Sequence, residues 1–275
     1  MNDKIKMFEL HLKEEERAEN TINKYLRDIN EFYKWYNNTG NVTKEILLGY
    51  KDYLKKSCLK VSSINSKISS LNAYFTYIEN ETLKLKVIKC QKSLFGSKEK
   101  ELTKNEFNRL YEAAKKDNRL RLLIETIAKT GARVSEVKYI TVESLEIGKA
   151  MVDNKGKVRI ILMPRKLCKI LKDYSKKERI KIGSIFITRS GKPLDRKQIW
   201  QMMKDLAKKA NVNPDKVFPH NLRHLFAREF YKQTHDIVKL ASILGHSSIE
   251  TTRIYTKETE DECRAEIERV SFIRD

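Results

Sequence analysis

Apolar residues recur every three or four positions along two stretches within the first ninety residues of this 275-residue chain. The first stretch comprises Ile22, Leu26, Ile29, Tyr33 and Tyr36, and the second comprises Ile64, Ile68, Leu71, Phe75 and Ile78. This spacing places each set on one face of an α-helix. An apolar helix face is stable only when another element covers it, so the N-terminal region is expected to be a bundle of helices. A third helix is expected after Thr43, a suitable N-cap, and a fourth over residues 5–16.

The helical pattern stops at a lysine-rich segment between residues 84 and 101. The segment ends at Leu102-Thr103-Lys-Asn-Glu106, where Thr103 and Glu106 have the spacing of a capping box. A chain of this length has room for two cores. We therefore predict a helical domain over residues 1–84, a basic linker over 85–101 and a second domain over 102–275.

The second domain is predicted to be mainly α with one β-hairpin, which makes the whole chain an α+β protein dominated by helices. Strands are expected at Ala150–Val152 and Val158–Met163, on either side of a turn that contains Lys155 and Gly156. Helices are expected near 103–116, 118–130, 164–180 and 195–210, with Asp195 as an N-cap, and again after Pro219.

The charge of the chain favours an acidic polymer as its partner. Lysine and arginine number 57 against 37 acidic residues, which gives a formal charge of +20 and a pI of about 9.6. Only 17 of the basic and 12 of the acidic residues lie within residues 1–97, so most of the excess belongs to the second domain. Nucleic acid is the leading candidate. A lysine-rich surface that merely aids solubility is the alternative. The Lys60 to Ser70 helix face could likewise contact the DNA backbone or face solvent; it carries Lys60, Ser62, Ser63, Lys67 and Ser70.

Several classes of protein do not fit the sequence. The four cysteines, Cys58, Cys90, Cys168 and Cys263, have neither disulfide-framework nor zinc-ligand spacing. We find no apolar run of membrane-spanning length and no signal peptide, so a cytoplasmic, nucleoid-associated protein without membrane contact is expected. No acidic cluster for a catalytic metal pair and no Gly-rich phosphate loop are visible, so we expect neither a metal nor a cofactor.

The 36 residues from His220 to Tyr255 concentrate reactive side chains. They contain His220-Asn-Leu-Arg223, Leu244-Gly-His246 and Thr252-Arg253-Ile-Tyr255. A phenol with an unperturbed pKa near 10 is only about one part in a thousand ionised at neutral pH, so a tyrosine nucleophile needs a partner that accepts its proton. Arginines stay charged and match the oxygens of a phosphate. This segment indicates attack on a phosphodiester.

Together with Thr130-Gly-Ala-Arg133-Val-Ser-Glu136 and Lys155-Gly156, these motifs resemble the tyrosine recombinase family in order and nearly in spacing. The similarity is closest to Xer-type recombinases and to simple phage or transposon integrases. It covers almost the whole chain, because Asn20-Thr-Ile-Asn-Lys-Tyr-Leu resembles the helical core-binding domain of that family. The resemblance implies that residues 1–84 are a SAM-like DNA-binding domain and that residues 102–275 are the catalytic domain with a C-terminal tail helix.

The resemblance implies a role for each motif residue. Tyr255 would attack DNA and form a 3′-phosphotyrosyl intermediate, and His220 would accept its proton. Arg133 and Arg223 would stabilise the charge on the phosphate, and Glu136 would orient its neighbours.

The remaining roles concern the leaving group and the phosphate. Lys155 would protonate the departing 5′ oxygen, with Lys157 as the alternative because this hairpin is one residue shorter than the Lys-Gly-x-Lys-x-Arg form of Xer enzymes. His246 would donate a hydrogen bond to phosphate, whereas His224 would pack structurally. Ser247 and Glu250 have capping-box spacing, so a short helix is expected to carry Tyr255 near its end.

The resemblance also implies an assembly. Four protomers would hold two paired core sites of double-stranded DNA and exchange strands through a Holliday junction. The C-terminal tail has an apolar face of Ile267, Val270 and Ile273, which by the resemblance would dock on a neighbouring protomer. Packing of this face within its own chain is the alternative. An accessory protein is left open, as is the choice between chromosome-dimer resolution and integration or excision of a mobile element. Two alternatives are a type IB topoisomerase and a DNA-binding regulator without catalysis.

Overall fold

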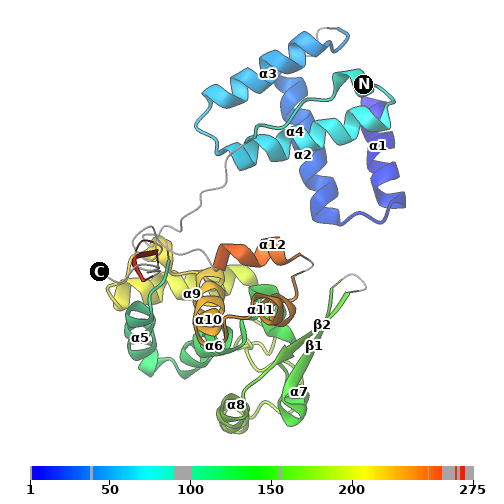
Figure 1. Cartoon of the computed structure of the whole chain (residues 1–275). Coiled ribbons are helices and arrows are strands. Elements are labelled where there is room, and N and C mark those ends of the chain that lie inside the picture. The colour runs from blue at the N-terminus through cyan, green and yellow to red at the C-terminus, as the bar shows by residue number, and fades with distance from the viewer. Residues whose placement is uncertain are drawn as a thin grey trace. The chain divides into compact units, whose positions relative to one another are not determined.

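The computed structural model describes residues 2–37, 40–89, 101–154, 157–246 and 248–255, together with residue 264 and residues 267–269. The chain divides into two compact units, Met1–Lys92 and Ser93–Asp275 (Figure 1). The expected linker over 85–101 contains this division, and its residues 90–100 lie outside the described part. Within the described ranges, no helix combines the length and the apolarity that crossing a membrane requires.

The described residues of the first unit form four helices and one 3₁₀ turn: α1 (Asn2–Glu14), α2 (Glu19–Trp35), α3 (Lys44–Lys56), α4 (Val61–Tyr77) and η1 (Glu81–Leu83). Helix α4 packs against α2 and α3, and α1 packs against α2. The predicted apolar faces form the core, in which Ile29, Phe32, Ile68 and Leu71 are fully buried. The four predicted helices are confirmed. Thr43 caps α3 as expected, because its hydroxyl accepts a hydrogen bond from the backbone of Ile46.

Part of the Lys60 to Ser70 helix face points into the unit rather than outward. The Ser70 hydroxyl is buried and donates to the Asp28 carboxylate at 2.8 Å, and Lys24 donates to both side chains. Burial raises the pKa of Asp28, but these hydrogen bonds outweigh burial and hold the pKa below its ordinary value. Lys67 forms an ion pair with Glu31. The prediction that Ser70 faces either DNA or solvent was therefore wrong.

The second unit is built around α10 (Pro219–Thr234), which packs against α6 (Asn118–Thr130), α9 (Arg196–Lys209) and α11 (Ile237–Leu244). The other elements are α5 (Lys104–Ala113), η3 (Ala114–Lys116), η4 (Val134–Tyr139), α7 (Val142–Ile147), β1 (Lys149–Asn154), β2 (Lys157–Leu162), α8 (Arg165–Lys177), η5 (Pro214–Lys216), α12 (Ile249–Thr252) and η6 (Arg253–Tyr255). The fold class is confirmed: the chain is mainly helical with one two-stranded sheet.

The strands β1 and β2 form the predicted antiparallel hairpin, with Val152 opposite Arg159. Ala150, Val152 and Ile161 lie on its buried face, whereas Met151 and Ile160 are exposed on the other. The hairpin contacts the rest of the unit through η4 and α11. Its buried face therefore connects to the two segments that carry Arg133 and His246.

Two helix starts in this unit match their sequence signals. Thr103 and Glu106 form the predicted capping box of α5, and Asp195 caps α9. At α12 the structure corrects the prediction, because Ser248 is the N-cap and accepts from the backbone of Glu250. Ser247 lies outside the described residues. The short helix nevertheless leads directly into η6, which ends at Tyr255.

Candidate active site

Arg223 lies at the centre of the site and is 2% exposed. Helix α10 begins with Pro219 at its first position, which places Arg223 one turn into the helix. Its Nη1 donates to the carbonyl oxygen of Gly131 at 2.5 Å, and its Nη2 donates to that of Leu244 at 2.7 Å. Burial, followed by the charges of two neighbouring arginines, lowers the pKa of Arg223 to about 10. The guanidinium therefore stays protonated at neutral pH.

Gly131 lets the chain turn from α6 towards Arg133. Its φ of 64° lies in the left-handed region, and a Cβ at this position would be 2.6 Å from Cδ1 of Phe226. The backbone N–H and Nη1 of Arg133 each donate to the Glu136 carboxylate at 2.8 Å. Burial raises the pKa of Glu136, but these bonds and the charge of Arg159 outweigh burial and lower it. Glu136 is thus an ionised, buried carboxylate between two guanidiniums.

Three arginines donate to three successive carbonyl groups at the end of α11. Arg159 donates to Ile243 at 3.0 Å, Arg223 to Leu244 at 2.7 Å and Arg133 to Gly245 at 3.3 Å. The last carbonyls of a helix have no partner within the helix and carry its negative dipole end, so cations are favoured there. The arginines come from three separate elements and meet at the turn that leads to His246.

His246 bridges Arg223 and α12. Its Nε2 lies 3.0 Å from Nη2 of Arg223, and its Nδ1 lies 2.9 Å from Oγ1 of the fully buried Thr252. A guanidinium can only donate, so Nε2 accepts and the proton of the neutral ring is on Nδ1. Burial, followed by the three neighbouring arginines, lowers the pKa of His246 to about 4. The expected hydrogen bond from His246 to phosphate therefore requires this ring to change its tautomer or take up a proton when DNA binds.

Tyr255 lies beside Arg223 and between two imidazole rings. It is 5% exposed, and it lies close enough to Arg223 to interact with the charge of that guanidinium. The His246 ring stacks at 5.8 Å between centroids, and the His224 ring meets the phenol edge to face at 4.6 Å. The structure thus brings Tyr255 to the arginine cluster, as the sequence predicts.

His220 reaches Tyr255 through His224 rather than directly. The His220 ring packs edge to face on His224 at 4.5 Å, and within the described residues it has neither a hydrogen bond nor a ring contact with Tyr255. Burial and the charges of Arg223 and Arg133 lower the pKa of His220. Burial has a larger effect on His224 than on His220 and lowers the pKa of His224 to about 3. His224, expected only to pack, therefore separates the proposed base from the nucleophile, a placement that the i and i+4 spacing of the two histidines permits.

The β-hairpin carries both candidates for the general acid, Lys155 and Lys157. Lys155 lies outside the described residues, and the structure describes the backbone but not the side chain of Lys157. Lys155 as the general acid, with Lys157 as its alternative, stays a prediction. The missed residue of the hairpin is Arg159, whose only sequence signal was its place as the final arginine of Lys155-Gly-Lys-Val-Arg159.

Two cavities flank this cluster. One, of about 330 Å³, is lined by Arg133, His220 and Arg223, and by Arg196 and Trp200 of α9. It offers a basic recess in which a DNA phosphate could contact both predicted arginines.

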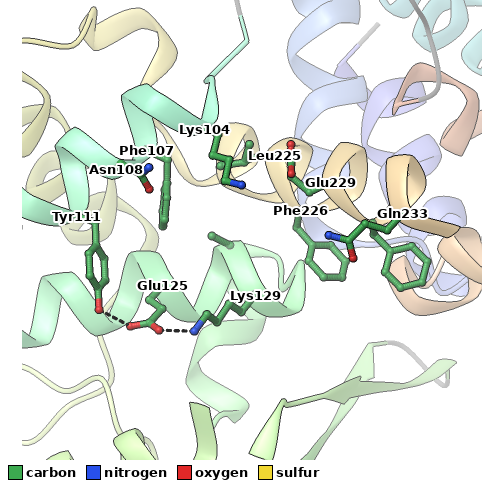
Figure 2. Close-up of a pocket in the computed structure, with 12 residues that line it drawn as sticks. Lys104, Phe107, Asn108, Tyr111, Glu125, Lys129, Leu225, Phe226, Glu229 and Gln233 are labelled. Carbon is green, nitrogen blue, oxygen red and sulfur yellow. Dashed lines mark hydrogen bonds and ion pairs between the residues drawn. The ribbon is translucent and has the colours of Figure 1, made fainter. Parts of the chain in front are cut away.

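The other cavity, of about 470 Å³, lies between α5, α6 and α10 (Figure 2). Phe107, Phe226 and Phe230 give it an apolar lining. Tyr111 and Lys129 both donate to Glu125 along one wall. Because Phe226 also lies against Gly131, this cavity and the arginine site share a wall.

Comparison with known proteins agrees with this arrangement. Residues 100–262 match the Phage integrase family, and residues 5–82 match the Phage integrase, N-terminal SAM-like domain. The chain belongs to the phage integrase family. This integrase-family chain is 30% identical to Tyrosine recombinase XerA of Pyrococcus horikoshii over 99% of its own length and 95% of the relative. The predicted identity as a tyrosine recombinase, and hence as an enzyme, is confirmed.

Solved structures extend the similarity to the fold. The crystal structure of XerA recombinase is 26% identical, covers 100% of this integrase-family chain and 99% of its own chain, and has a TM-score of 0.55. A lambda integrase dimer bound to a COC′ core site is 19% identical, with coverages of 94% and 96% and a TM-score of 0.74. The second likeness concerns the fold alone.

Proposed function

We propose that this tyrosine recombinase cuts and rejoins double-stranded DNA at paired core sites through a 3′-phosphotyrosyl intermediate on Tyr255. The observation that carries the proposal is the place of Tyr255, which is buried beside Arg223 and His246 at a cluster of three arginines. A tyrosine hydroxyl at a buried cationic centre is suited to attack a phosphodiester.

The charge of the cluster suits the transition state of this reaction. Attack on a diester adds negative charge to its non-bridging oxygens, and preorganised donors stabilise that charge best. Arg133, Arg159 and Arg223 carry three positive charges, and Glu136 cancels one of them. The remaining excess faces the recess beside His220. Arg133 and Arg223 are proposed to contact the phosphate, and Glu136 to orient Arg133.

The proton transfers involve groups near each end of the broken bond. His220 is proposed to accept the Tyr255 proton once DNA binding brings their atoms within reach, because its lowered pKa keeps it neutral and able to accept. Lys155 is proposed to protonate the departing 5′ oxygen. The covalent link conserves the energy of the phosphodiester, so the 5′ hydroxyl of a second strand can reseal it. Two such exchanges would pass through a Holliday junction.

The decisive test is covalent capture on DNA. The target site would be selected from a randomised pool of nicked duplexes by covalent trapping on the wild-type protein. Cleavage next to the nick frees a short fragment that carries the 5′ hydroxyl. This fragment dissociates, so the strand cannot be resealed and the adduct persists. We expect a Tyr255→Phe variant to form no adduct and a Tyr231→Phe variant to form as much as the wild type. Tyr231 contacts His235 and so provides a matched control. Equal trapping by both variants would remove Tyr255 as the nucleophile.

The same selected sites separate the two alternatives. A type IB topoisomerase would relax a supercoiled plasmid without exchanged products, and a regulator would bind the duplex without any adduct. Paired sites on one plasmid should instead yield recombinant circles or inversions.

Assembly on DNA is proposed to use the cavity of Figure 2. Its aromatic lining matches the apolar tail residues Ile267, Val270 and Ile273, and Ile267 is 71% exposed in the single chain. We propose that each tail fills the cavity of a neighbouring protomer, giving a homotetramer. Tail residues 256–263, 265–266 and 270–275 lie outside the described part. Ile267→Asp should leave adduct formation on a single site intact and abolish the four-protomer complex in a gel-shift or mass-photometry assay.

The two units receive separate parts of this proposal. Residues 1–84 are proposed to bind the core site on DNA, residues 85–101 to connect the two units, and residues 102–275 to catalyse strand cleavage and rejoining. The DNA substrate implies a cytoplasmic, nucleoid-associated protein. Neighbouring genes for transposition or conjugation would favour a mobile-element integrase over an Xer-type resolvase. If an accessory protein is needed, recombination of paired sites by the purified protein should require added extract of the host cell.

A further inference from the structure

Arg159 is a buried arginine that the motif comparison does not assign to the reaction. It lies on the buried face of β2, opposite Val152, and its side chain is 9% exposed. A buried arginine on a short hairpin is costly unless its charge and its donors are satisfied. Its partners therefore indicate why the position is charged.

Those partners belong to two other elements of the site. Nη1 of Arg159 forms an ion pair with Glu136, and Nη2 donates to the Ile243 carbonyl at 3.0 Å. The side-chain stem lies against Gly245, where an added Cβ would be 2.4 Å from Cδ of Arg159. Gly245 also has a φ of 62°, so both its conformation and its contact favour glycine. The hairpin, η4 and the end of α11 thus meet on one side chain.

The partners of Arg159 hold the groups that are proposed to contact phosphate. Glu136 also accepts from the backbone and side chain of Arg133. Ile243 is followed by the carbonyls that bind Arg223 and Arg133, and then by His246. Movement of Arg159 would therefore shift three phosphate-facing groups at once.

We propose that Arg159 is a positioning residue of the recombination reaction: it fixes the Glu136 carboxylate and the turn before His246 relative to strand β2. This inference rests on the proposed function for its effect on cleavage. Arg159 does not itself touch the reacting atoms in this assignment. Its fork is required because one flat group must reach a carboxylate and a carbonyl together, which a lysine ammonium does less well.

A substitution can remove the fork without leaving an orphaned charge. In Arg159→Met the Glu136 carboxylate keeps two donors from Arg133, so its charge stays paired and the large cost of an uncompensated buried charge is avoided. A displacement of about 1 Å in catalytic groups lowers rates on the order of 100-fold. We therefore expect a folded variant with a large defect in cleavage.

The experiment compares Arg159→Met and Arg159→Lys with Lys149→Met, an exposed position on the neighbouring strand. Adduct formation is measured on the selected nicked duplex at saturating protein, with duplex affinity and Tm measured in parallel. Arg159→Met should lower the rate about 100-fold with affinity and Tm near wild type, Arg159→Lys should lie between, and Lys149→Met should match the wild type.

A second readout does not depend on DNA. Nitrogen NMR of ¹⁵N-histidine-labelled protein should show His246 protonated on Nδ1 alone in the wild type and as mixed tautomers in Arg159→Met. A wild-type rate in Arg159→Met, a fall in Tm that parallels the fall in rate, or an unchanged His246 spectrum would each overturn the inference. If instead the wild type forms no adduct, the proposed function fails, while the His246 spectrum still decides whether Arg159 positions that turn.

Discussion

Thr252→Val tests whether the hydroxyl behind His246 sets the tautomer of that ring. Thr252 is fully buried, and its Oγ1 lies 2.9 Å from Nδ1 of His246. Valine has nearly the same shape but cannot accept a hydrogen bond, so Nδ1–H loses its partner. The protonated ring that would donate from Nε2 to phosphate also needs an acceptor at Nδ1, so the variant disfavours that state.

The size of the effect follows from how deeply His246 is buried. Leaving a buried donor without a partner costs about 1–3 kcal/mol. His246 is only partly buried, so water can reach the ring and the lower end, about 1–1.4 kcal/mol, applies. If this cost falls on the transition state, the cleavage rate drops about 5- to 10-fold, since about 1.4 kcal/mol corresponds to tenfold.

Single-turnover trapping on the nicked duplex measures this loss, and the neighbouring exposed Thr251→Val provides the control. Thr251→Val should cleave as fast as the wild type. If Thr252→Val also cleaves at the wild-type rate, or if both valine variants lose equally, Thr252 does not act through His246.

Two further predictions concern protons. The pKa values of His224 and His246, about 3 and about 4, lie below their ordinary 6.5 chiefly because of burial, so the folded state binds fewer protons than the unfolded state in this interval. The free energy of unfolding should therefore be constant above about pH 7 and fall as the pH drops from 6.5 towards 4, and melts that are flat across this window would contradict the burial of both rings. For the general acid, Lys155→Ala should slow cleavage of an ordinary duplex strongly but cleave a duplex with a 5′-bridging sulfur nearly as fast as the wild type, because a thiolate leaves without a proton. If Lys157→Ala shows this rescue instead, the alternative assignment is right.

Features that depend on local spacing could be predicted from the sequence. The helical faces in the first unit, the capping box at Thr103 and the β-hairpin need only residues within a few positions of one another. The order of the motifs predicts candidate residues for the site, and the structure brings five of them, Arg133, Glu136, Arg223, His246 and Tyr255, together.

Features that depend on contacts between residues far apart in the sequence could not be predicted. Ser70 is buried because Asp28, 42 positions away, needs a donor, and the serine pattern of the helix gives no sign of this. Arg159 meets Ile243 across 84 positions, so its role is invisible in the hairpin sequence. His224 shares a face with His220, but only the packing of η6 on α10 shows which histidine the tyrosine contacts. The order of motifs in the sequence predicts the candidate side chains, whereas their contacts follow only from the fold.

The way the arginines are held accounts for why the site can act on phosphate. A buried guanidinium is usually satisfied by a carboxylate, but each carboxylate would also cancel a charge that the transition state needs. Here Glu136 pairs with Arg133 and Arg159, and among the described residues Arg223 has no carboxylate partner. All three arginines also donate to main-chain carbonyls. Carbonyls at a helix end satisfy hydrogen bonds and offer only the partial negative charge of the helix dipole. The cluster therefore keeps its positive charge while its geometry is fixed. A substitution that adds a carboxylate beside these arginines should lower the cleavage rate even where it raises the free energy of unfolding.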